Sequence, residues 1–165
     1  MCFVKSKHCM THVVSDEDQF VYKVMYRYHL TSLEWFGSIH YNRYMPYHLT
    51  ETIVPANTVD LEQLDEKKLL TNGVIHCING GIMAKTLYDE YVNSPYSAFG
   101  ELVIVQCIIP KGTPFWVNKN FVEIACTKLV LWRIVEREEL SHGLKNEAFR
   151  QAVCERRASG EKEEA

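Results

Sequence analysis

The sequence lacks the features that define several large classes of protein. No apolar run approaches the roughly 20 residues that span a bilayer, and Met1-Cys2-Phe3-Val4-Lys5 does not open as a signal peptide does. Positive charge is not in excess, because 18 Lys and Arg stand against 21 Asp and Glu, for a net charge of −3. That balance argues against a protein that binds nucleic-acid phosphates. We therefore expect a soluble cytoplasmic protein with neither membrane nor nucleic acid among its partners.

Short catalytic motifs are missing as well. Asn79-Gly80-Gly81 is not followed by the Lys-Ser/Thr of a phosphate-binding loop. The sequence contains neither a G-x-S-x-G nucleophile turn nor a pair of histidines at metalloprotease spacing. These absences weigh against hydrolase and nucleotide-hydrolysing activities, and we expect no cofactor.

The six cysteines are scattered, which predicts no disulfide framework. Cys2, His8, Cys9 and His12 offer soft ligands, and the Cys9-x-x-His12 spacing is one that zinc can use. The alternative is a plain terminal segment, because the other spacings match no familiar zinc module. We expect no metal site. Three further cysteines lie in apolar stretches, where cysteine behaves as a small hydrophobe: Cys77, Cys107 and Cys126.

The chain has the length and apolar content of one globular domain, with 165 residues of which 47% are hydrophobic. Tyrosine and valine alternate with polar side chains over 20–29, the pattern of a half-buried strand, and 33–41 is its expected hairpin partner. The run 102–109 is apolar on both faces, which is typical of a central strand. Shorter strands are expected at 50–54 and 74–78, and an antiparallel meander at 114–117, 121–125 and 128–135.

Three helices are expected. One covers 60–70, where Asp60 is an N-cap candidate, and one covers 82–92, where Met83, Leu87 and Tyr91 form an inward stripe. The third is amphipathic and covers 144–157. The predicted fold class is α+β: a mostly antiparallel twisted sheet with two short internal helices and a C-terminal amphipathic helix. Residues 1–18 are a lead-in, 19–158 form a single domain, and 159–165 are a disordered tail.

Aromatic residues are crowded in one part of the sequence. Nine of the 19 aromatic residues fall between Phe20 and Tyr47. Residues 41–48, which follow the hairpin and are expected to form a loop, combine aromatic rings with an amide and a guanidinium. Such a combination suits a planar anionic ligand, since rings stack on a base and arginine pairs with phosphate. The alternative is that Tyr22, Tyr26 and Tyr28 cover the sheet with their hydroxyls in water. Trp116, likewise, could be a core residue. The candidate ligand-binding residues are Tyr41, Asn42, Arg43, Tyr44, Trp116 and Lys119.

Two other positions could carry chemistry. His76 and Cys77 are adjacent, but neighbours on a strand point to opposite faces and cannot act as base and nucleophile. Glu123 stands alone in an apolar strand, so it is either solvent-facing or a pocket carboxylate.

Several segments occur in an order that resembles a group of small uncharacterised bacteriophage and prophage proteins, over roughly residues 1–135. The most specific of them is the Ile109-Pro110-Lys111-Gly112-Thr113 turn that follows the apolar run. The other segments are Val21-Tyr22-Lys23-Val24, Ile75-His76-Cys77-Ile78, Glu123-Ile124-Ala125 and Leu129-Val130-Leu131.

A more distant similarity is to the ADP-ribosyltransferase fold. Those enzymes carry Arg or His on an early strand, a Ser/Thr or Tyr motif midway, and Glu on a late strand after a turn. The similarity implies that Lys23 takes the basic position, His76-Cys77-Ile78 the middle motif and Glu123 the acid. Lysine lacks the bidentate geometry of arginine, and Cys77-Ile78 supply no hydroxyl. The similarity therefore implies a ligand-binding remnant more readily than an enzyme.

Together these resemblances imply a non-catalytic phage protein that binds a small nucleotide-like signal and acts as an anti-defence sponge in the cytoplasm of the infected bacterium. Two alternatives stay open. One is an NAD-using ADP-ribosyltransferase-like enzyme that relies on Lys23, His76 and Glu123, and the other is a protein that binds and inhibits a host factor. The aromatic surface and the amphipathic last helix also predict a homo-oligomer.

Overall fold

The structure of the protein is a computed structural model that describes residues 11–14, 16–39, 46–54, 75–117 and 122–142. The helices expected at 60–70 and 144–157, and the tail at 159–165, lie outside the described residues. Within them the chain is an antiparallel β-sheet with one α-helix and two short 3-10 helices. The α+β class is therefore confirmed, as is the mainly antiparallel sheet.

Nine strands form one sheet, in the order β1-β7-β8-β5-β2-β6-β9-β4, with β3 paired to β2 beside this path. Residues 11–14 of the expected lead-in form an edge strand of it. The strands are β1 (Thr11–Val14), β2 (Gln19–Leu30), β3 (Leu33–Gly37), β4 (Thr52–Ile53), β5 (Ile75–Ile78), β6 (Glu101–Ile109), β7 (Pro114–Val117), β8 (Glu123–Cys126) and β9 (Leu129–Val135).

The two strands with the clearest sequence patterns occupy the centre of the sheet. β2 and β6 pair over nine residues, from Gln19 opposite Ile109 to Arg27 opposite Glu101. The expected hairpin of β2 and β3 is confirmed. The expected meander is wrong in its last step, because β9 does not pair with β8 but crosses to β6 and β4. Strand neighbours depend on contacts far apart in sequence, which period and turn signals do not encode.

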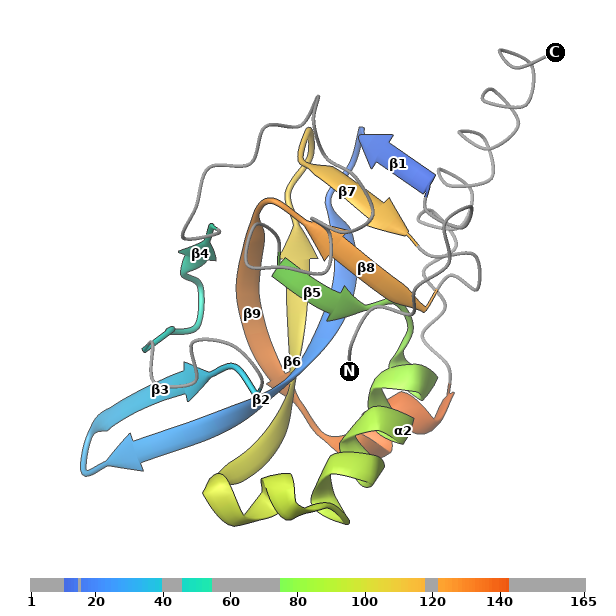
Figure 1. Cartoon of the computed structure of the whole chain (residues 1–165). Helices are drawn as coiled ribbons and strands as arrows, with labels where there is room; N and C mark the ends of the chain where they lie inside the picture. The colour runs from blue at the N-terminus through green and yellow to red at the C-terminus, as the bar shows by residue number, and fades with distance from the viewer. Residues whose placement is uncertain (1–10, 15, 40–45, 55–74, 118–121, 143–165) are drawn as a thin grey trace, which may run out of the picture.

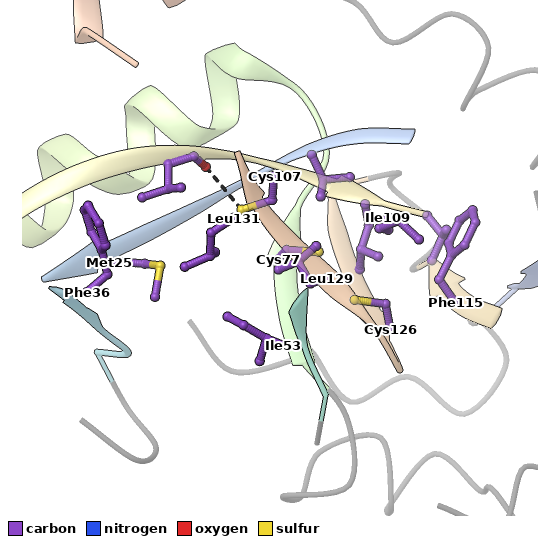
Figure 2. Packing of buried hydrophobic residues seen from close by; sticks show 14 of the residues in the cluster. Met25, Phe36, Ile53, Cys77, Cys107, Ile109, Phe115, Cys126, Leu129 and Leu131 are labelled. Carbon is purple, nitrogen blue, oxygen red and sulfur yellow. Dashed lines mark hydrogen bonds between the residues drawn. The ribbon is translucent and has the colours of Figure 1, made fainter. Parts of the chain in front are cut away.

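The inner face of the sheet is concave and holds the main core. Residues from both ends of the strand order, such as Ile53 on β4 and Phe115 on β7, belong to one buried cluster, so the sheet curls upon itself (Figures 1 and 2). Val21 and Met25 of β2 point into it, as do Val105 and Cys107 of β6. Burial of this apolar face is the principal stabilising term of the fold.

The outer face of the sheet is covered along part of its length by α2 (Gly81–Val92) and by the 3-10 helix η3 (Arg137–His142). Tyr22 and Tyr26 of β2 are buried beneath this layer, so their hydroxyls are not in water as one interpretation expected. The inward stripe of α2 is also corrected. Leu87 and Tyr91 are buried as expected, but Ala84 takes the place of Met83, which is exposed. The smaller side chain lets the helix approach the sheet closely.

A second 3-10 helix, η2 (Pro95–Phe99), links α2 to β6. The β2–β3 hairpin projects away from the curled part of the sheet toward the side where η2 and the end of α2 lie (Figure 1). None of the helices in the described part of the chain has the length and apolarity that crossing a bilayer requires.

Candidate functional site

The outer face of the β2–β3 hairpin carries a stacked pair of aromatic rings. Tyr28 and Trp35 lie directly opposite each other, with ring centroids 5.7 Å apart and ring planes 27° from parallel. Both residues are half-buried. We call this pair the aromatic platform. The two rings are therefore already paired in the absence of a ligand, and part of their area remains accessible.

A buried aromatic layer supports the platform from the side of the helices. Tyr26 is fully buried next to Tyr28, with ring centroids 6.1 Å apart, and its hydroxyl donates a 2.7 Å hydrogen bond to the carbonyl oxygen of Tyr96. Tyr96 in turn meets Tyr91 of α2 edge to face at 5.5 Å. The rings of the platform are thus held by packing and by a hydrogen bond. Such support lowers the entropy cost of binding.

Gly100 explains how β6 approaches the hairpin so closely. A Cβ atom at this position would lie 3.1 Å from Cε1 of Tyr28 and 3.2 Å from Cδ1 of Tyr26. The absence of a side chain therefore lets both tyrosine rings lie against the backbone where β6 begins.

The inner side of the same hairpin is ionic. The Arg27 guanidinium donates to one carboxylate oxygen of Glu34 through Nε at 2.9 Å and through Nη2 at 2.6 Å. Glu101 lies 4.0 Å from Arg27 and 3.8 Å from His29. Strand alternation therefore places these charges on the face opposite to the Tyr28–Trp35 pair.

Four of the predicted ligand-binding residues, Tyr41, Asn42, Arg43 and Tyr44, lie outside the described residues. Both ends of the segment that contains them are placed beside the hairpin. Ile39 is buried in the same cluster as Tyr26, with Tyr28 packed against it, and Tyr47 exchanges two backbone hydrogen bonds with Phe36 of β3. The described chain therefore ends at Ile39 and resumes before Tyr47 beside β3 of the hairpin.

The other two predicted ligand residues are not brought to this site by any described contact. Trp116 lies on β7, which is separated from β2 by β8 and β5, and only 7% of it is exposed. That burial matches the alternative interpretation, in which Trp116 is a core residue. Lys119 lies outside the described residues.

The three segments assigned through the ADP-ribosyltransferase similarity lie on neighbouring strands. β5 lies between β2 and β8, so Lys23, His76 and Glu123 occupy three adjacent strands of the sheet. Their side chains do not share one face, however. Glu123 pairs with Ile78, which pairs with Tyr22, so Glu123 lies on the outer face and Lys23 on the inner one. A ligand on one face of the sheet cannot contact both the ammonium and the carboxylate.

Lys23 has a structural role in this arrangement. β2 and β5 form a single pair, Tyr22 opposite Ile78, before the strands separate. Beyond that pair Nζ of Lys23 donates a 2.8 Å hydrogen bond to the carbonyl oxygen of His76. The side chain thus bridges the two strands where the backbone ladder has ended. Glu123 is 4% exposed, which excludes the solvent-facing interpretation.

Polar contacts that the sequence did not reveal tie η3 to the outer face. Arg137 donates two hydrogen bonds to Asp89 of α2, at 2.7 and 2.8 Å, and these bonds lower the pKa of the Asp89 carboxyl. Nε of Arg133 donates to Oε1 of Gln106 at 2.8 Å, and Glu139 lies 3.3 Å from the same guanidinium. Burial raises the pKa of the neighbouring Tyr22. Sequence alone did not connect these residues, because their separations reach 48 positions.

The three apolar cysteines confirm their expected role as small hydrophobes. Cys77, Cys107 and Cys126 are buried in the inner core and carry no disulfide (Figure 2). Burial raises the pKa of the Cys77 and Cys107 thiols, while the nearby Lys23 ammonium opposes that rise. The two thiols therefore stay protonated at neutral pH and are poor nucleophiles. No group of three or more His, Cys, Asp or Glu side chains in the described part of the chain could hold a metal ion.

Comparison of the chain with family models, with curated proteins and with solved structures finds no match.

Proposed function

We propose that the protein is a non-catalytic binding protein for a small nucleotide-like ligand, whose planar ring stacks on the aromatic platform of Tyr28 and Trp35. The observation that carries the proposal is the half-buried stacked pair on a rigid aromatic support. Stacking of a base on a protein ring contributes about 1–3 kcal/mol. That contribution needs flat rings with some accessible area, and both rings of the platform are half-buried rather than fully covered.

The charged part of such a ligand requires a cation and hydrogen-bonding groups. In the proposal Arg43 pairs with a phosphate and Asn42 binds the edge of the base, with Tyr41 and Tyr44 beside them. The support for this part is the position of Ile39 and Tyr47, which hold both ends of the segment at the hairpin.

The resemblance to phage proteins extends the proposal to biology. A phage protein that sequesters a nucleotide signal in the host cytoplasm would need affinity and no catalysis. The opposite orientations of Lys23 and Glu123 agree with that requirement, since they leave the similarity to ADP-ribosyltransferases without a shared catalytic face.

Titration calorimetry against cyclic dinucleotides, cyclic mononucleotides and ADP-ribose tests this function. Binding of at least one ligand is expected, and Trp35→Ala should weaken it by roughly tenfold to hundredfold, the loss of one stacking contact. Ile82→Ala is the control, because Ile82 is an exposed apolar residue that lies on α2. Heat from none of these ligands, or equal losses in the two variants, would refute the proposal.

A second candidate function is NAD cleavage with transfer of ADP-ribose. It is favoured by the position of His76 and Glu123, which share the outer face on the adjacent strands β5 and β8. In that reaction the bond between nicotinamide and ribose breaks, and an acceptor or water takes the ribose carbon. Glu123 would stabilise the positive charge that develops on the ribose. Release of nicotinamide from NAD that disappears in Glu123→Gln supports this candidate, and its absence in the wild-type protein removes it.

A further inference from the structure

An apolar strip lies on the outer face of the sheet where α2 and η3 do not cover it. Phe20 of β2 is opposite Ile108 of β6, and Ile108 is opposite Val130 of β9, so the three side chains form one row. Thr52 continues the row beyond β9, because it pairs with Val130, and Val54 follows two residues later along the chain. Four neighbouring strands extend about 14 Å across. Phe20 is 45% exposed and Val54 is 59% exposed.

A bulge in β9 adds a tryptophan to this strip. Cys107 pairs with Leu131 and Gln106 pairs with Arg133, so Trp132 is an extra residue without a partner position on β6. Leu131 points into the inner core and is fully buried. Trp132 and Arg133 consequently both lie on the outer face, where Trp132 is 46% exposed. Two large exposed aromatic side chains on one apolar strip are typical of a surface that binds another molecule.

Charges at one end of the strip have opposite signs on its two sides. Asp18 immediately precedes β2 and Lys128 immediately precedes β9, and both are exposed. Because β2 and β9 each run antiparallel to β6, these two residues lie at the same end of the sheet, with β6 between them. The acidic side is reinforced by Asp16 and Glu17.

We propose that a second copy of this chain binds to the strip, related by a twofold axis that runs along β6 within the interface. Such an axis places the β2 side of one copy over the β9 side of the other. Phe20 then meets the partner's Trp132, and Asp18 meets the partner's Lys128. The strip thus places ring against ring and opposite charges against each other. An axis across the strands would instead place the charged end over the opposite end of the partner.

Sedimentation velocity or light scattering over a concentration series tests the proposal. The wild-type chain should show twice the mass of one chain at concentrations on the order of 100 µM. Phe20→Lys and Trp132→Lys should each raise the dissociation constant roughly 30-fold or more, as removal of a central aromatic anchor does. Leu33→Lys is the control, because Leu33 is also exposed but lies at the hairpin tip, and it should leave the dimer intact.

Charge exchange tests the orientation of the axis. Lys128→Glu should weaken the dimer, and the double variant Asp18→Lys with Lys128→Glu should restore it. Asp18 also accepts a 2.8 Å hydrogen bond from the backbone N–H of Lys111, so the unfolding temperature of each variant is measured alongside to show that the fold is kept.

A wild-type chain that stays monomeric would overturn the proposal. So would a dimer that survives both Phe20→Lys and Trp132→Lys, or one that Leu33→Lys disrupts equally. A double charge variant that remains as weak as Lys128→Glu would overturn the proposed axis. The nucleotide titration above does not depend on any of these results, so the two proposals succeed or fail separately.

Discussion

The aromatic end of the outer face and the polar seam are stabilised in different ways. The polar seam is the set of hydrogen bonds by which Lys23 and Arg137 join separate elements of the fold. At the aromatic end, Tyr26, Tyr28 and Trp35 pack on one another and on the helices, with one hydrogen bond from a tyrosine hydroxyl. In the polar seam, Lys23 of β2 donates a hydrogen bond to the backbone of β5 on the inner face, and Arg137 of η3 donates to Asp89 of α2 on the outer face. The first region is held by buried aromatic side chains, and Tyr28 and Trp35 remain half-buried at its surface. In the second, the described polar groups serve the fold.

The largest effect is expected at the aromatic end. Tyr26→Ala should lower the free energy of unfolding by about 3–5 kcal/mol, because a fully buried ring is replaced by a cavity. Tyr26→Phe keeps the ring and loses only the bond to the Tyr96 carbonyl, so about 1 kcal/mol is expected. Urea denaturation measures both. Equal losses would mean that the hydroxyl, and not the ring, stabilises this end.

A substitution at Gly100 should have the next largest effect. The new Cβ of Gly100→Ala would crowd Tyr26 and Tyr28, and because Tyr26 is fully buried it has little room to move. A loss of about 1–2 kcal/mol is expected. If the crowding is the cause, the double variant Gly100→Ala with Tyr28→Leu should lose less free energy of unfolding than the sum of the two single variants. Additive losses would contradict it.

Substitutions in the polar seam should lower the free energy of unfolding by less. Lys23→Met removes the hydrogen bond to the His76 carbonyl and should cost about 1 kcal/mol. Lys111→Met is the control, because Lys111 is exposed and only its backbone N–H makes a described bond. A loss as large as that of Tyr26→Ala would contradict the comparison, because the seam would then stabilise the fold as much as the aromatic end does.

The smallest effect is a dependence on pH. The folded pKa of Asp89 lies below its ordinary value of 3.8, because Arg137 donates two hydrogen bonds to the charged form. The pair therefore stabilises the fold above pH 3.8 and stops doing so as the pH falls through the folded pKa. Both side chains are partly exposed, so the effect is expected to be small. Between about pH 6 and about pH 3, the unfolding temperature should fall less steeply in Asp89→Asn than in the wild-type chain.

The platform could have been found from the sequence through its hairpin. With a turn at Thr31-Ser32, Leu30 pairs with Leu33, and the antiparallel register then sets Tyr28 opposite Trp35. The hairpin of 20–29 with 33–41 and the crowding of aromatic residues were both predicted, but the register that sets Tyr28 opposite Trp35 was not. Lys23 and Glu123 could not be placed in the same way, since the face on which each lies depends on the pairing of three strands distant in sequence.

Local chemistry by itself determined the strand pattern of β2 and β6, the hairpin and the helix that follows Gly80-Gly81, because alternation and turn residues act between near neighbours. The tertiary structure alone decided that β9 leaves β8 for β6, that the sheet curls around the three cysteines, and that α2 covers one part of the outer face while Phe20 and Trp132 stay exposed. These outcomes rest on which distant surfaces bury each other best, and the free energy of that burial belongs to the whole fold rather than to any one segment.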